Sequence, residues 1–269
     1  MAIKNVLITG DTHGRTTERL DYIQTIMTDY APEETAVIIL GDAGLNYYLD
    51  SSDERKKRQV NAFGFTIYCV RGNHEARPGD VPGMHLVNDD FVKGTVWMQD
   101  EYPNIRYFTD WGVYNIQGRR TLVIGGAYSV DKHYRLQQGW QWFANEQLTD
   151  YERRSCARNV KDRHFDLVLS HTCPASLQPT DLFLGFIDQK SVDNTMEKWM
   201  DDLMPLMCWR LHLWGHYHAD RIEAPYCEMF YTEVEDLKDI EKRWQHFDET
   251  GELDWWLPLS PVMERLHRR

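Results

Sequence analysis

The sequence of 269 residues predicts an α/β fold built on a parallel sheet. Short apolar runs alternate with helical segments over residues 3–70, the links between them are short, and each run ends at or near a glycine. Apolar residues make up 42% of the chain, which is enough for a substantial core. No run of 18 apolar residues occurs, so we expect no membrane-spanning segment and no membrane partner.

The N-terminal part of the chain supplies the alternation. We expect strands at 3–9, 36–40 and 65–70, because these stretches are short and almost wholly apolar. Between them, 16–30 has apolar residues at helical spacing, and 52–63 is a polar helix that begins at a Ser or Asp cap. Strand, helix, strand, helix and strand with short links are typical of a parallel sheet.

The rest of the chain is less regular. Residues 105–130 predict two or three antiparallel strands with a turn near Gly118, and residues 131–163 predict helix. We predict one main domain over 1–235 and an extension over 236–269 that packs on it. The remaining expected elements are strands at 165–171, 208–216 and 226–234 and a helix at 192–207.

Charge and cysteine content restrict the function classes. The net charge of −12 argues against non-specific coating of nucleic acid, and we find no strong nucleic-acid signal. We interpret the basic clusters at 54–58 and 119–120 as a solvated helix face and a hairpin turn. Five cysteines without a CxxC pair indicate a reducing compartment. Because the N-terminus does not resemble a signal peptide, we expect a cytoplasmic protein. The oligomeric state stays open.

Polar side chains of metal-ligand type follow five of the predicted strands. The segments are GDTHG (10–14), GDAG (41–44), RGNHE (71–75), SHTCP (170–174) and GHYH (215–218). Loops that follow neighbouring strands of an α/β sheet converge on one edge. The mixture of carboxylate, amide and imidazole suits Mn, Fe or Zn better than Mg or Ca. The candidate side chains are Asp11, His13, Asp42, Asn73, His74, His171, His216 and His218.

Each motif also has a structural explanation when it is taken alone. Gly-Asp after a strand is common turn chemistry, and Asn-His in a loop is equally ordinary. His212, which alternates with apolar neighbours, is interpreted as a histidine packed within a strand. The structural explanation becomes weak only because it must account for all five segments at once.

The order of these motifs resembles the calcineurin-like metallophosphoesterase superfamily, whose pattern is DxH, GDxx(D), GNH(D/E), a lone H and GHxH. The resemblance spans residues 10–218. It implies a two-sheet β-sandwich flanked by helices, with a dinuclear metal site at the carboxyl ends of the strands.

The resemblance assigns seven of the side chains to two metal ions. Asp42 would bridge both ions, because one carboxylate can satisfy two cations. The other six would divide into two sets of three: Asp11, His13 and His218 for one ion, and Asn73, His171 and His216 for the other.

The same resemblance leaves His74 off the metals and makes it the catalytic residue. Two cations about 3.5–4 Å apart can clamp a phosphoryl group and generate a hydroxide for in-line attack. The leaving alkoxide then needs a proton, which an imidazole beside the site can donate near neutral pH. His74 is adjacent to a candidate ligand and is the natural acid.

Two departures from the family pattern bear on the substrate. Leu45 stands where protein phosphatases of this superfamily carry a second Asp, and no Arg follows, which argues against a phosphoprotein phosphatase. Arg15, Arg71 and Arg77 flank the motifs and are candidate phosphate contacts. For Arg15 the alternative is a helix start, and for Arg77 a surface role is favoured.

We therefore expect a dinuclear metal-dependent phosphoesterase that hydrolyses a phosphate diester or monoester, with a small or nucleotide-like substrate favoured by the acidic charge. Two alternatives stay open: a nuclease of the same superfamily, and a non-catalytic scaffold with this fold.

Segment 128–143 is the expected specificity wall. It offers aromatic faces for a flat group, and Lys132 and Arg135 for a phosphate. The alternative is that Trp140 and Trp142 pack this segment on the core.

Overall fold

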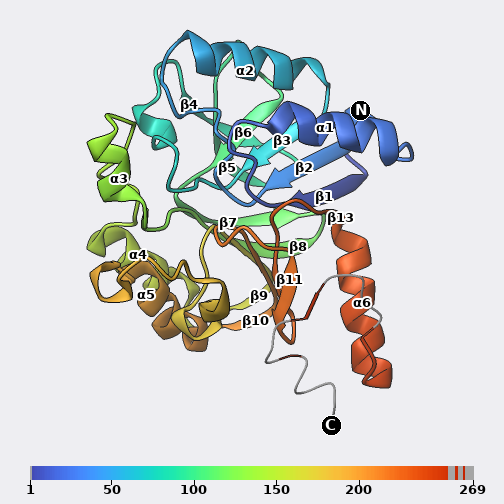
Figure 1. Ribbon diagram of the computed structural model, residues 1–269. Helices are drawn as coiled ribbons and strands as arrows, with labels where there is room; N and C mark the ends of the chain where they lie inside the picture. The colour runs from blue at the N-terminus through green and yellow to red at the C-terminus, as the bar shows by residue number, and fades with distance from the viewer. Residues whose placement is uncertain (1, 254–257, 260–262, 264–269) are drawn as a thin grey trace.

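Two β-sheets pack face to face in a computed structural model that describes residues 2–253, 258–259 and 263 (Figure 1). Helices cover the outer face of each sheet. The two-sheet α/β sandwich implied by the resemblance is thereby confirmed. None of the described helices is both long and apolar enough to cross a membrane.

The first sheet has seven strands in the order β13-β1-β2-β3-β6-β5-β4. Its centre is parallel, as the N-terminal alternation predicts, and its edges are antiparallel. The parallel strands are β1 (Asn5–Thr9), β2 (Thr35–Ile39), β3 (Thr66–Cys69) and β6 (Ile105–Phe108). The antiparallel strands are β13 (Val234–Asp236) at one edge, and β5 (Gly94–Met98) and β4 (His85–Asp89) toward the other edge.

The second sheet has six strands in the order β11-β12-β10-β9-β8-β7 and repeats this plan. Its parallel strands are β8 (Arg119–Ile124), β9 (His164–Ser170), β10 (Cys208–Trp214) and β12 (Cys227–Met229). The antiparallel edges are β7 (Trp111–Ile116) and β11 (Arg221–Ala224).

Alternation along the strands divides the core into layers. Val6 and Ile8 of β1 point between the sheets, where they join Val123 and Leu169 from the second sheet. Leu7, between them, points outward into the cluster beneath the helices. Both faces of these strands are therefore buried, which explains why they appear in the sequence as continuous apolar runs.

The helices form the outer layers. Helices α1 (Thr16–Ile26) and α2 (Ser51–Ala62) cover the first sheet, and α4 (Asp150–Val160) and α5 (Thr195–Leu203) cover the second (Figure 1). The other helices are α3 (Lys132–Gln137) and α6 (Leu237–Thr250). Short 3-10 turns occur at Pro32–Glu34, Pro78–Asp80, Ala175–Leu177, Thr180–Leu182, Gln189–Ser191 and Met204–Leu206.

The region between the third and fourth motifs differs from the prediction. Strand β6 pairs parallel with β3 in the first sheet, and only β7 and β8 form the expected antiparallel hairpin. The β4–β5 hairpin was not expected at all, because β4 is largely exposed and carries little apolar periodicity. Within residues 131–163, only α3 and α4 are helical. Residues 138–149, which connect these two helices, form turns and irregular chain.

Helix α6 joins the two sheets at one edge through a buried ionic cluster. Arg243 donates hydrogen bonds to Glu228 of β12, at 2.6 Å, and to Glu235 of β13, at 2.9 Å. Trp244 also donates its indole N–H to Glu228. The domain boundary at residue 235 stays a prediction; residues 254–257, 260–262 and 264–269 of the expected extension lie outside the described residues.

We predict that Arg243→Met lowers the free energy of unfolding by about 3–5 kcal/mol, because it leaves two buried carboxylates without their cation. Urea unfolding followed by circular dichroism measures this loss. Lys242→Met is the matched control, since Lys242 is exposed and pairs with Asp239 one turn away, and we expect it to leave the unfolding midpoint unchanged. Equal midpoints for the two variants would contradict a role for the cluster in joining the sheets.

Candidate metal centre

The five motif loops meet where the carboxyl ends of the two sheets face each other. Residues 10–14, 41–44 and 71–75 follow β1, β2 and β3 of the first sheet. Residues 171–174 and 215–218 follow β9 and β10 of the second. The sandwich therefore brings all eight candidate side chains to one place, although they are spread over more than 200 positions in the sequence.

Asp11, His13 and His218 form one group. The Nε2 atom of His218 lies 3.3 Å from Asp11 Oδ2 and 2.8 Å from His13 Nε2, and His13 Nε2 lies 3.8 Å from the same carboxylate oxygen. Asp11 Oδ2 is buried and has no hydrogen-bond partner among the described residues. A buried carboxylate oxygen is costly unless a donor or a cation satisfies it, so this group fits a metal ion.

Asn73 and His171 face each other in a second group. The Nδ1–H of His171 donates to the Leu40 carbonyl at 2.9 Å, which leaves a lone pair on Nε2. The amide nitrogen of Asn73 donates to Ser129 Oγ at 2.9 Å, which turns its Oδ1 toward His171 Nε2, 2.8 Å away. In the neutral ring, Nε2 and Asn73 Oδ1 are two acceptor atoms that a metal ion beside them would satisfy, so this group also fits a metal ion.

Asp42 lies between the two groups. Its Oδ2 is 3.6 Å from His171 Nε2 and 4.0 Å from His13 Nε2, and its Oδ1 accepts the His74 backbone N–H at 2.8 Å. Burial by itself raises the pKa of Asp42, but the imidazoles of His171, His74 and His13 outweigh burial and lower it. The carboxylate is therefore ionised and central.

His216, which follows β10 as His171 follows the neighbouring β9, completes the second group. Its ring lies 4.9 Å from that of His171, and its backbone N–H donates to Asp11 Oδ1 at 3.0 Å. Burial, and then the neighbouring His171, hold the pKa of His216 well below its usual value. The ring is therefore neutral and has a lone pair to offer.

The backbone is left-handed at four of the eight candidate side chains: His13 (φ 45°), Asp42 (47°), His216 (72°) and His218 (53°). Residues other than glycine rarely adopt this conformation, although Asp and His tolerate it better than most. Such strain persists only where the surrounding structure imposes it, and it gathers at functional sites. The loops thus turn sharply in order to point these side chains inward.

Glycines in the motifs make room for ligands from other loops. A Cβ atom at Gly72 would lie 1.9 Å from Asp42 Oδ1, and one at Gly215 would lie 2.2 Å from Asp11 Oδ1. Both distances are far inside van der Waals contact. Gly72 and Gly215 are therefore each required by a carboxylate of a different motif.

Residues 4–220 match the family model of the calcineurin-like phosphoesterases. The chain belongs to this family. Members normally bind divalent metal ions, and the cluster described above is placed to do so. No curated protein matches the sequence significantly.

Several solved structures are similar to this calcineurin-like phosphoesterase. TT1561 of Thermus thermophilus is 12% identical, with a TM-score of 0.43 over 87% of this chain and 98% of that one. AQ665 from Aquifex aeolicus is 13% identical, with a TM-score of 0.42 over 90% and 99%. Phosphopantetheinyl hydrolase from Mycobacterium tuberculosis is 10% identical, with a TM-score of 0.41 over 92% and 93%.

Two buried acidic residues support the candidate ligands of this phosphoesterase from behind. Glu75 accepts the Gly44 N–H at 2.6 Å and thereby fixes the GDAG loop; burial raises its pKa to about 8. Glu146 accepts the Ser129 hydroxyl at 2.6 Å, and Ser129 in turn accepts from Asn73. Glu75 belongs to a motif, whereas no local sequence signal marks Glu146, which is reached only through the fold.

His212, the histidine interpreted as packed, is buried within β10. Its Nε2 lies 2.7 Å from Ser170 Oγ, and burial lowers its pKa to about 3. It is therefore neutral, and it packs beside Trp214 with ring centroids 4.8 Å apart. The interpretation as a packed strand histidine is confirmed.

Three of the four arginines near the motifs donate hydrogen bonds to other groups of the protein. Arg71 donates to the Glu146 carbonyl at 2.8 Å, and Arg77 donates to Glu152 at 2.6 Å. Arg15 stands exposed at the start of α1, in agreement with a helix start. Arg135 is buried and donates to Ser129 at 3.2 Å, so the expectation that it contacts phosphate is wrong. Arg135 lies behind the site because it is hydrogen-bonded to Ser129, which is in turn hydrogen-bonded to Glu146.

Trp140 and Trp142 differ from each other. Trp140 is 53% exposed, so the alternative that it packs on the core is wrong. Trp142 is half-buried; it donates its indole N–H to Glu146 at 2.9 Å, and Lys132 lies 4.0 Å above its ring. Segment 128–143 therefore supports the site with one tryptophan and presents the other to solvent.

Two cavities border the cluster. One, of about 360 Å³, is lined by Asp42, Asn73, His216 and His218 and by apolar side chains of residues 182–192. The other, of about 580 Å³, is lined by His13 and by aromatic side chains of residues 47, 48 and 140. The ring of His74 borders both cavities, and burial lowers its pKa while Asp42 opposes that shift.

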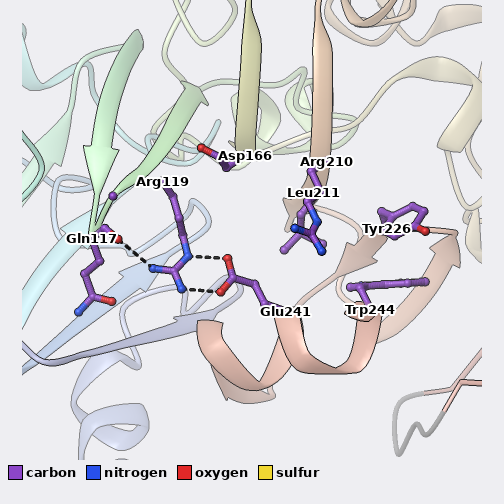
Figure 2. Close-up of a pocket in the computed structure, with 9 residues that line it drawn as sticks. Gln117, Arg119, Asp166, Arg210, Leu211, Tyr226, Glu241 and Trp244 are labelled. Atoms are coloured by element: carbon purple, nitrogen blue, oxygen red, sulfur yellow. Dashed lines mark hydrogen bonds and ion pairs between the residues drawn. The ribbon is translucent and has the colours of Figure 1, made fainter. Parts of the chain in front are cut away.

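A third cavity, of about 350 Å³, lies apart from the candidate ligands, between the β7–β8 turn, β10 and α6 (Figure 2). Arg119 and Glu241 pair within it through two hydrogen bonds. Asp166 accepts the Arg120 N–H at 2.8 Å. These charges are already compensated, and the lining contains none of the candidate ligands.

We predict that Gly72→Ala removes divalent metal from the protein, because the added methyl group displaces the Asp42 carboxylate. Gly185→Ala is the matched control, since nothing lies within 4 Å of a Cβ atom there. Metal content after loading with Mn²⁺ and gel filtration, measured by mass spectrometry, gives the result. Normal content in the Gly72→Ala protein would mean that the carboxylate is not held as described.

Proposed function

We propose that this calcineurin-like phosphoesterase hydrolyses phosphate esters with two divalent metal ions, Mn, Fe or Zn. Two observations carry the proposal: the buried Asp11 Oδ2 has no hydrogen-bond partner among the described residues, and Asn73 Oδ1 lies 2.8 Å from His171 Nε2. Imidazole nitrogens mixed with carboxylate and amide oxygens suit these metals.

The proposed ligand sets follow the two groups. Asp42, which lies between the groups, serves both ions. The first ion takes Asp11, His13 and His218, and the second takes Asn73, His171 and His216.

The chemistry divides between ions and protein. When bound, two such ions neutralise phosphate charge and make water nucleophilic at neutral pH. The protein orients the ligands: the His74 backbone N–H holds Asp42, and Ser129 holds Asn73. We propose the His74 side chain as the catalytic acid that protonates the leaving oxygen, because His74 lines both cavities beside the candidate ligands.

Other features support a small-molecule or nucleotide-like ester. Leu45 stands where protein phosphatases of this family carry a second Asp, and no Arg follows it, which argues against a phosphoprotein substrate. The net charge of −12 disfavours a nuclease, and the complete ligand set disfavours a non-catalytic scaffold. All five cysteines are free thiols, which supports a cytoplasmic location.

We predict that wild-type protein loaded with Mn²⁺ holds about two ions per chain. Asp42→Asn loses both, because the amide cannot serve two cations, whereas His218→Ala falls to about one ion. His246→Ala, on the exposed face of α6, is the control and keeps the wild-type content. Metal analysis with hydrolysis of bis(4-nitrophenyl) phosphate measures both properties. Full occupancy in Asp42→Asn would refute the bridging assignment.

We predict that His74→Asn keeps its metal and loses about 10²–10⁴-fold in kcat for esters with alkoxide leaving groups, the usual contribution of general acid catalysis. The loss is much smaller for 4-nitrophenolate, which departs without a proton. Asparagine retains the backbone N–H that holds Asp42, so the site itself stays assembled. Equal losses for both leaving groups would point to positioning instead of proton donation.

A further inference from the structure

The cluster of candidate ligands lies between two cavities of opposite character, and His74 is the side chain that borders both. A phosphate placed at the cluster therefore has room on either side for a substituent. A phosphomonoester has one organic substituent and would leave one cavity unused, whereas a phosphodiester has two.

The smaller cavity has an apolar wall. Its volume is about 360 Å³, and its outer wall comes from the loop that follows β9. Leu182 and Leu184 are 40% and 51% exposed, so their apolar surface is not covered by the rest of the described protein. The apolar side chains of this wall are Leu182, Phe183, Leu184, Ile187 and Val192.

This wall is tied to the motif loops. Phe183 stacks on Tyr217, with ring centroids 6.3 Å apart and planes 20° apart, and Tyr217 stands between His216 and His218. Arg221 binds Asp181, just before the wall, through two hydrogen bonds of 2.8 Å each. The apolar side chains are thereby held at a fixed place beside the candidate ligands, as a binding wall requires.

The polar end of the same cavity is formed by Glu197. Its carboxyl group is buried: one oxygen accepts the Thr172 hydroxyl at 2.8 Å, and the other has no partner within the described part of the chain. A buried oxygen without a partner is available to a ligand that carries a hydrogen-bond donor.

The larger cavity, of about 580 Å³, is aromatic and carries a cation. Tyr48 and Trp140 expose about half of their surfaces, 48% and 53%. The Lys56 ammonium group lies 5.2 Å from the Tyr48 ring centroid and donates to the Gly44 carbonyl at 3.3 Å. Asp50, on the same rim, is engaged in capping α2 through the Ser52 N–H. These groups suit a flat or polar substituent and not an alkyl chain.

We infer that the substrate is a phosphodiester with two unlike substituents, an apolar one that enters the cavity walled by residues 182–192 and a flat or polar one that lies against Tyr48 and Trp140. The inference rests on the proposed function and narrows its substrate class. Residues 54–58, interpreted from the sequence as a solvated face, contribute Lys56 to this second side.

The test is a series of alkyl 4-nitrophenyl phosphates, from methyl to hexyl, with the Mn²⁺-loaded protein. Burial of each additional CH₂ raises kcat/KM by roughly threefold to fourfold until the cavity is filled. The monoester 4-nitrophenyl phosphate reacts less well than the hexyl diester. A second measurement uses methyl hexylphosphonate, whose P–C bond is not hydrolysed and whose methoxide is a poor leaving group, and we expect it to raise the melting temperature more than methyl methylphosphonate does.

Matched variants test whether the chain-length dependence arises from the apolar wall. Leu184→Ser with Ile187→Ser flattens the chain-length dependence and removes the excess thermal shift. Phe186→Ser is the control, because Phe186 is 82% exposed in the same loop and is not part of the cavity lining. Leu184 and Phe186 are exposed and Ile187 is half-buried, so we expect the melting temperatures of both variants without ligand to stay near that of the wild type.

The outcomes separate the two hypotheses. Hydrolysis of all the esters with no dependence on chain length overturns the inference and leaves the proposed function intact. A chain-length effect that survives in Leu184→Ser with Ile187→Ser also overturns it. Failure to hydrolyse any ester, with metal bound, refutes the proposed function itself.

Discussion

The arrangement of the site depends on two buried carboxylates, Asp11 and Asp42, that share a small volume with several imidazoles. Neither carboxylate is exposed enough to be solvated by water, and Asp11 Oδ2 has no donor within the described residues. Isolated buried charges are too costly to persist, so this centre is built for cations. Because the two carboxylates follow adjacent strands of the first sheet and the imidazoles come from both sheets, the sandwich must bring both sheet edges together here.

That requirement accounts for local features that otherwise look unfavourable. Left-handed backbone at His13, Asp42, His216 and His218 costs conformational energy, and the loops accept it in order to aim these side chains inward. The remote cluster around Arg243 has a related role, because it fixes the two sheets against each other at an edge outside the site. Strain in the loops can persist only on a scaffold whose sheets do not slide.

The sequence predicts those structural elements whose conformation is determined by residues that are close together in the chain. Strands buried on both faces are continuous apolar runs, and a motif that must turn and ligate carries its Gly, Asp and His together, so the N-terminal half-sheet and the five loops could be predicted. The β4–β5 hairpin could not, because its faces are half exposed and its pairing is set by β6. Arg135 was misjudged because its partner Ser129 is joined to Glu146, a contact that only the fold creates.

Specificity is less visible in the sequence than chemistry for a physical reason. Proton donors and metal ligands must be particular residue types. Few amino acids are therefore accepted at those positions, and the sequence shows a recognisable pattern there. An apolar wall needs only side chains of suitable size, and Leu182, Leu184 and Ile187 look like any loop leucines and isoleucine. These side chains form a wall because of their position in the fold. The hydrogen bond from Arg221 to Asp181 and the stacking of Phe183 on Tyr217 fix that position, and each contact joins residues about 35–40 positions apart in the sequence. Within one family, therefore, substrate range can change through such loops while the metal centre stays the same.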